Sequence, residues 1–181
     1  MRTVLFVDAA HFVLSTFLGW IWSKSRMYVK AASGRQRYNV LGAWNAVTRQ
    51  LTSVTNDTYV TATTVCELLQ KNAAENLGKP ITLVLDNARY QRCHLVQNLA
   101  ATLNIELLFL PSYSPNLNLI ERLWKFTKKE VLNSRHQGSF ANFRQAIDHC
   151  HHNLPTTHRE KMQSLMTLKF QTFENVAMLA V

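Results

Sequence analysis

Short apolar runs that alternate with segments of helical periodicity predict an α/β fold. The first part of the chain carries three runs rich in β-branched and aromatic residues, at residues 3–9, 26–32 and 37–48. Polar residues around Ser33 separate the last two runs and indicate a turn. The three runs therefore predict strands that pair in antiparallel fashion, with Asp8 near the end of the first.

The second part of the chain alternates helical and strand patterns. These patterns occupy residues 61–77, 81–85, 92–103 and 105–110. Gly78 and Pro80 stop the first helix in the usual way. Because strand–helix–strand crossovers bring strands together in parallel, we expect a mixed five-stranded sheet, antiparallel in its first three strands and parallel in its second half, with helices on both faces.

The remaining chain reads as helical. The segment PSYSPNLN (residues 111–118) breaks the apolar pattern, a helix carrying Glu121 follows it, and another helix is predicted over residues 139–153. No composition shift marks a linker after that point. We expect one domain over residues 1–153 and a C-terminal helical tail, residues 154–181, packed on it.

Composition limits the classes of function. The 181 residues include 20 Lys plus Arg against 11 Asp plus Glu, and a net charge of +9 predicts a polyanionic partner. Three cysteines without CxxC spacing argue against a disulfide framework or a zinc ribbon. The longest stretch without a formal charge has 15 residues, too few to span a bilayer. We expect a soluble cytoplasmic protein associated with the nucleoid, without a membrane partner.

Three of the few acidic residues stand at positions where sites are built. Asp8 and Asp86 end strands expected to be central neighbours, and Glu121 lies early in the helix after the next strand, so the three can meet at one edge of the sheet. Singly, such an Asp is often a turn former or a helix cap. Together, three carboxylates repel one another unless cations neutralise them, and Mg²⁺ prefers oxygen ligands. Two such ions can promote phosphodiester cleavage, which suits the expected polynucleotide substrate.

Spacing and motifs add a family resemblance. Between Asp86 and Glu121 lie 34 residues, the D-D-34-E pattern. The surrounding motifs are FVDAAHF (6–12), GRQRYNVLGAWN (34–45), LVLDNARYQ (83–91) and LLFLPSYSPNLNLIERLWKFTKK (107–129). With them the chain resembles the catalytic domain of bacterial insertion-sequence transposases of the mariner superfamily. The resemblance implies an RNase H-like fold, two Mg²⁺ ions (or Mn²⁺) held by Asp8, Asp86 and Glu121, and DNA cleavage and strand transfer at insertion-sequence ends by a homodimer.

The chain departs from the family pattern at several positions. The family usually has an acidic residue where Ala9 stands, a His where Gln91 stands, and Pro where Ser112 and Leu119 stand. Family members also carry an N-terminal helix-turn-helix region that reads the transposon ends, whereas this chain begins about seven residues before Asp8. Either a separate reading frame supplies that region or the gene is truncated.

Polar side chains near the three carboxylates are predicted DNA contacts. They are Asn87, Arg89, Arg92, Arg122, Lys125, Lys128 and Lys129. The alternatives are that Asn87 only forms a turn and that the basic helix face is only solvated. Trp44 and Trp124 are expected in the core rather than stacked on bases. In the DHCHH block (148–152), neighbouring side chains point around a helix, which disfavours a structural zinc site.

Two rival functions remain open. A catalytically silent, truncated relic that only binds DNA is compatible with the departures from the family pattern. A phosphatase or receiver-type domain also places an Asp at a strand end. A haloacid-type phosphatase, however, needs a second Asp two residues after its nucleophile, where this chain has Ala10, and neither class requires a Glu 34 residues beyond an Asp.

Overall fold

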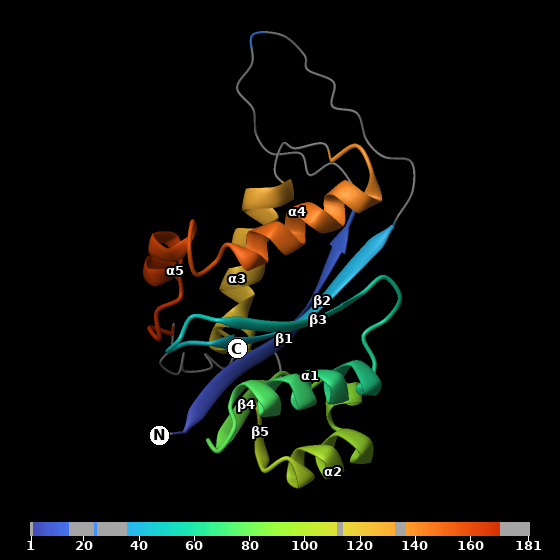
Figure 1. Cartoon of the computed structure of the whole chain (residues 1–181), viewed down its shortest axis with the longest axis vertical. Helices are drawn as coiled ribbons and strands as arrows, with labels where there is room; N and C mark the ends of the chain where they lie inside the picture. The colour runs from blue at the N-terminus through green and yellow to red at the C-terminus, as the bar shows by residue number, and fades with distance from the viewer. Residues whose placement is uncertain (1, 15–23, 25–35, 112–113, 133–136, 171–181) are drawn as a thin grey trace, which may run out of the picture.

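A five-stranded sheet with β1 at its centre organises the molecule (Figure 1), and its order is β3-β2-β1-β4-β5. The computed structural model describes residues 2–14, 24, 36–111, 114–132 and 137–170. The strands are β1 (Thr3–Val13), β2 (Arg37–Asn45), β3 (Leu51–Asn56), β4 (Ile81–Leu85) and β5 (Ile105–Phe109). β1, β2 and β3 pair in antiparallel fashion, whereas β1, β4 and β5 are parallel. The predicted mixed sheet is therefore confirmed.

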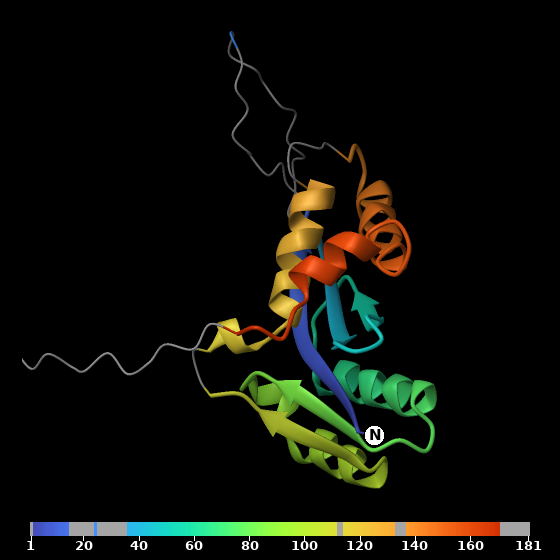
Figure 2. The ribbon, with the colours of Figure 1, turned by 90° about the vertical axis from the view of Figure 1, so that its left-hand side faces the viewer.

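Helices cover both faces of this sheet. The helical elements are α1 (Ala62–Glu75), η1 (Arg89–Gln91), α2 (His94–Thr102), η2 (Pro115–Leu117), α3 (Ile120–Thr127), η3 (Lys128–Leu132), α4 (Phe140–His152) and α5 (Arg159–Leu165). The layers are clearest when Figures 1 and 2 are compared: α1 and α2 lie on one side of the strands, and α3 and α4 lie on the other. No helix in the described ranges is long and apolar enough to cross a bilayer.

Side-chain alternation along β1 divides the core in two. Leu5 and Val7 face the cluster formed with α1 and α2, while Phe6, Ala10 and Phe12 face the cluster formed with α3 and α4. Asp8 has the same parity as Phe6, so its side chain belongs to the face that α3 covers. The apolar pattern of β1 thus determines which helix the first predicted site residue meets.

The pairing among the antiparallel strands differs from the prediction. The run 37–48 ends as a strand at Asn45, because the Asn45 side chain accepts hydrogen bonds from the backbone N–H groups of Val47 (2.9 Å) and Thr48 (3.0 Å) and closes a turn. The third antiparallel strand is β3, which has too few apolar residues to stand out in the sequence. The strand predicted over residues 26–32 lies outside the described residues.

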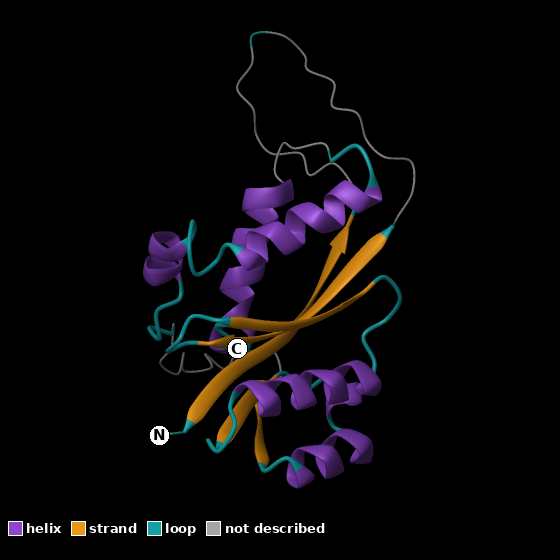
Figure 3. Ribbon diagram, in the orientation of Figure 1, coloured by secondary structure: helices purple, strands orange, loops and turns teal. Residues whose placement is uncertain are grey.

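The helical layer over Asp8 is continuous from α3 onward. Figure 3 shows α3 and the helical turns that follow it crossing the sheet beneath α4. The turn η3 is π-helical, a form often found at functional sites. The described part of the tail adds Leu154, Met162 and Met166 to the core cluster beneath α4. The domain boundary at residue 153 stays a prediction.

Candidate active site

Parallel pairing brings the two aspartates together. Phe6 of β1 is paired with Val84 of β4, and two residues further along each chain come Asp8 and Asp86. Within β1, Asp8 points to the same face of the sheet as Phe6, while Asp86 directly follows the last residue of β4. Asp8 does not end its strand as predicted, because pairing with β2 continues beyond it to Val13. The edge on which the aspartates lie is formed by the end of β4 rather than by the end of β1.

Glu121 is carried to this edge by the first turn of α3. The preceding loop is anchored by Asn118, whose Nδ2 donates a hydrogen bond of 2.9 Å to the backbone carbonyl of Val7. The backbone N–H of Glu121 in turn donates to the carbonyl of Asn118 at 3.2 Å. A buried side chain therefore ties the start of α3 to the β1 residue directly before Asp8. Asn118 went unrecognised in the sequence, although it lies inside the last quoted motif.

The three carboxylates interact electrostatically. Burial, followed by the negative charge of Glu121 and then that of Asp86, raises the pKa of Asp8 from 3.8 to about 7, although hydrogen bonds from the Ala9 backbone and the Trp124 side chain oppose the shift. Tyr90, four residues after Asp86, has a pKa raised to about 12 by burial and by the charges of Asp86 and Asp8. Asp8 therefore stands among charges of its own sign.

The chemistry of these donors fits divalent cations. Among the described residues, no lysine, arginine or histidine forms an ion pair with Asp8, Asp86 or Glu121. Within the same residues, no three acidic, His or Cys side chains are grouped so as to hold one ion. A three-ligand cluster is not required, because Mg²⁺ is usually bound through one or two carboxylates together with waters and substrate phosphates. Three carboxylates are therefore enough for two ions, if one carboxylate contacts both ions and each ion has one further carboxylate.

The predicted DNA contacts divide into two groups. Arg89, Lys125 and Lys129 are exposed, and Lys128 is half-buried. The other three have protein partners. The Nδ2 of Asn87 donates to the Leu110 carbonyl at 2.6 Å, the Arg92 guanidinium lies 4.7 Å from the centre of the Phe109 ring, and the Arg122 guanidinium donates to the backbone carbonyls of Leu165, Thr167 and Lys169. Arg122 thus secures the C-terminal segment against α3.

Gln91, which stands where the family usually has His, is fully buried. Neither atom of its side-chain amide has a hydrogen-bond partner among the described residues. An unsatisfied buried amide normally costs free energy. This departure therefore changes the interior beside Tyr90, a residue that responds to the charges of the site.

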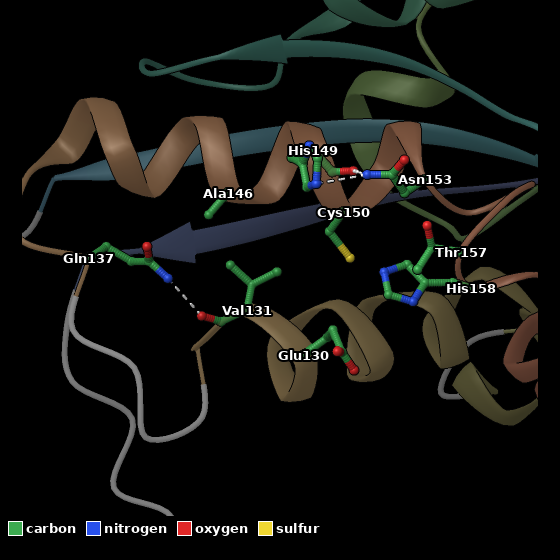
Figure 4. Close-up of a pocket in the computed structure, with 9 residues that line it drawn as sticks. All are labelled: Glu130, Val131, Gln137, Ala146, His149, Cys150, Asn153, Thr157 and His158. Carbon is green, nitrogen blue, oxygen red and sulfur yellow. Dashed lines mark hydrogen bonds between the residues drawn. The ribbon is translucent and has the colours of Figure 1, made fainter.

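The side chains of the DHCHH block have partners other than the three carboxylates. Asp148 accepts a hydrogen bond of 2.6 Å from the Tyr38 hydroxyl, His149 pairs with Asn153, and His151 packs 5.8 Å from the Trp124 ring. Figure 4 shows a pocket between α4 and η3 that includes His149 and Cys150. None of the predicted site residues lines this pocket, so it is separate from the candidate active site.

A mixed five-stranded sheet of this order, with helices on both faces, is the RNase H-like fold. The chain belongs to the DDE superfamily endonucleases, because the sequence profile of that family matches residues 3–144. A curated relative, the uncharacterised protein y4pE/y4sA of Sinorhizobium fredii (strain NBRC 101917 / NGR234), is 32% identical over an alignment of 90 residues that covers 46% of this chain and 62% of the relative.

Solved transposase and integrase structures share the fold. The Mos1 strand transfer complex matches with a TM-score of 0.62 and 15% identity, over 96% of this chain and 56% of that chain. The mariner Mos1 paired end complex with Mg matches with a TM-score of 0.64 and 14% identity, over 94% and 57%. The catalytic core domain of BIV integrase gives a TM-score of 0.54 and 15% identity, over 86% and 84%. The chain therefore spans little more than half of the Mos1 chains it resembles and most of the integrase core.

In metal-free buffer, the Asp8→Asn variant should be more stable than the wild type at pH 8. Below about pH 4 the Asp8 carboxyl is neutral in both the folded and the unfolded chain. Between that pH and about 7 the unfolded chain loses the proton while the folded chain keeps it, so wild-type stability falls with rising pH. Urea unfolding in EDTA should give the variant an advantage of at least about 1 kcal/mol at pH 8, shrinking toward pH 4. A stability advantage of the variant that is the same at pH 4 and at pH 8 would contradict the raised pKa of Asp8.

Proposed function

We propose that this chain is the catalytic part of a DDE transposase that cleaves DNA at the ends of an insertion sequence and joins the freed end to target DNA. The observation that carries the proposal is the electrostatic interaction of Asp8 with Glu121 and Asp86, none of which has a basic ion-pair partner among the described residues. Family membership supports the nuclease class. The Mos1 structures, a strand transfer complex and a paired end complex with Mg, support this substrate and a divalent metal.

The three carboxylates would hold two Mg²⁺ or Mn²⁺ ions, with Asp8 shared between them, Asp86 completing one site and Glu121 the other. A bound pair of such ions activates water and stabilises the leaving oxygen in phosphodiester cleavage. In the first reaction a water oxygen bonds to phosphorus and the bond to the 3′ oxygen breaks, which leaves a 3′-hydroxyl and a 5′-phosphate. In the second, that 3′-hydroxyl attacks a target phosphodiester and a target 3′-hydroxyl leaves, so the number of phosphodiester bonds is conserved.

The proposed DNA contacts lie along the helix that presents Glu121. Glu121 and Lys125 are four residues apart on α3, so they share one face of the helix, and Lys128 and Lys129 extend this basic stretch. Arg89 and Arg92 follow Asp86 and Asn87 in the chain, at η1, and are further proposed contacts. Arg122 is left out of the proposed contacts because its guanidinium is engaged by backbone carbonyls of the tail. We further propose that two copies act on paired ends within the cytoplasm.

Glu121→Gln should abolish Mg²⁺-dependent cleavage while leaving the fold intact. The variant removes one ionic ligand but keeps the shape of the side chain, and loss of several kcal/mol of charge stabilisation lowers the rate at least about 100-fold. The measurement is strand cleavage of a duplex carrying the terminal repeats that flank the gene, with and without Mg²⁺. Glu160→Gln is the matched control, since Glu160 also lies in the first turn of a helix, α5. Full cleavage by the Glu121→Gln variant would rule out the proposed site. Binding without cleavage by the wild type would favour the silent relic.

The double variant Lys125→Gln/Lys129→Gln should weaken DNA binding in a salt-dependent way. Each lysine that contacts phosphate contributes about one unit to the slope of log affinity against log salt, so the slope should fall by about two. Fluorescence anisotropy with a labelled duplex over a KCl series gives this slope. Lys71→Gln/Lys79→Gln removes the same charge from exposed positions on α1 and at the opposite end of β4, and it should leave the slope nearly unchanged. Equal slopes for both double variants would place the DNA elsewhere.

A further inference from the structure

The indole of Trp124 reaches Asp8 across a part of β2 that carries no side chain. Gly42 is the β2 residue paired with Asp8 in the antiparallel register. A Cβ atom at Gly42 would stand 2.7 Å from Cη2 and 3.0 Å from Cζ2 of Trp124. The same atom would stand 3.0 Å from Cδ1 of Leu51. Since Cβ contacts below 3.0 Å essentially do not occur in proteins, a larger residue at position 42 requires the indole, or the backbone that carries Gly42, to shift. Gly42 therefore leaves the space through which Trp124 approaches the site.

Trp124 holds Asp8 through a defined hydrogen bond. Its Nε1–H donates to Oδ2 of Asp8 at 3.0 Å. The indole is 2% exposed, and its ring lies edge-on to Phe12, with 6.2 Å between the ring centres, and beside His151. Packing on several sides therefore fixes the ring that carries the donor. Such a buried ring has no face available for stacking on a base.

Trp44 shows that an indole in this core does not need a polar partner. Trp44 is fully buried in the same cluster, two residues along β2 from Gly42, yet its Nε1 has no hydrogen-bond partner among the described residues. The contact between Trp124 and Asp8 is therefore more than a consequence of burying an indole. The two tryptophans differ chiefly in whether the N–H meets the carboxylate.

The donor chemistry of an indole suits a carboxylate that must remain available to a cation. The indole N–H is uncharged and can only donate. A Lys or Arg in its place would neutralise Asp8 and compete with a metal ion for the same oxygens. The indole instead orients the carboxylate and leaves its negative charge in place.

We propose that Trp124 is a positioning residue of the candidate metal site, which fixes the orientation of the Asp8 carboxylate that both ions would share, and that Gly42 is required for it to do so. This inference rests on the proposed function, because it assumes that Asp8 binds divalent metal. Hydrogen bonds that orient metal ligands typically change metal affinity about 10- to 100-fold when they are removed.

The test is Mn²⁺ binding by the full chain without DNA, followed by the electron paramagnetic resonance signal of free Mn²⁺. Trp124→Phe keeps most of the buried ring but removes the N–H, and it should weaken Mn²⁺ binding about 10-fold or more. Trp44→Phe is the matched control, since it makes the same substitution in the same cluster without touching Asp8; it should bind Mn²⁺ as the wild type does. Thermal unfolding of both variants separates lost stability from lost metal affinity.

Gly42→Ala provides an independent variant that leaves the indole chemically intact. By displacing Trp124 it should weaken Mn²⁺ binding to a similar degree. Because both single variants would break the same hydrogen bond, Gly42→Ala/Trp124→Phe should bind Mn²⁺ about as weakly as Trp124→Phe alone. If Trp124→Phe does not fold, Gly42→Ala still decides the question.

The outcomes distinguish this inference from the function beneath it. If Trp124→Phe or Gly42→Ala binds Mn²⁺ with wild-type affinity, or if Trp44→Phe loses as much Mn²⁺ affinity as they do, the positioning role is overturned but the metal site is not. A folded wild-type chain that binds no Mn²⁺ at millimolar concentration would overturn both. Weakened binding in the Trp124 and Gly42 variants alone is the expected result.

Discussion

The charge of the Asp8 carboxylate is the constraint on which the rest of the site depends. Asp8 lies on the central strand, and burial together with Glu121 and Asp86 raises its pKa to about 7. A neutral residue at position 8 would relieve the repulsion and stabilise the folded chain. The carboxylate therefore lowers the stability of the fold, and the needs of folding do not explain its presence. In the proposed function, divalent cations would supply the missing positive charge, and the phosphate groups of DNA would bring further oxygen ligands.

The scaffold brings this charge to one place through backbone geometry. Parallel pairing of β1 with β4 extends to Phe6 and Val84, two residues before Asp8 and Asp86, and Asn118 ties the start of α3, which carries Glu121, to the carbonyl of Val7. Arg122 then secures the tail against α3. Asp8 and Glu121 lie on regular elements, β1 and α3, whereas Asp86 directly follows the last residue of β4.

The sequence predicted most of this arrangement where its pattern was strong. β4, α1, α2, β5 and α4 follow apolar runs or helical periodicity, and the three carboxylates stand out because acidic residues are scarce. The pattern failed where side chains, rather than periodicity, decide the outcome. The Asn45 side chain ends β2 early, and β3 is too polar to be recognised from its apolar residues. The hydrogen bonds of Arg122 to the tail join residues more than forty positions apart, which no local pattern reveals, and its predicted contact with DNA stays a prediction.

The central claim is that Asp8, Asp86 and Glu121 together hold divalent metal. Anomalous diffraction from crystals of the chain grown in Mn²⁺ tests it most directly, because manganese can be located without reference to activity. The account predicts anomalous peaks at the Asp8 carboxylate, one shared with Asp86 and one with Glu121. A well-ordered structure at millimolar Mn²⁺ with no peak beside Asp8, or with manganese bound only at other residues, would contradict it.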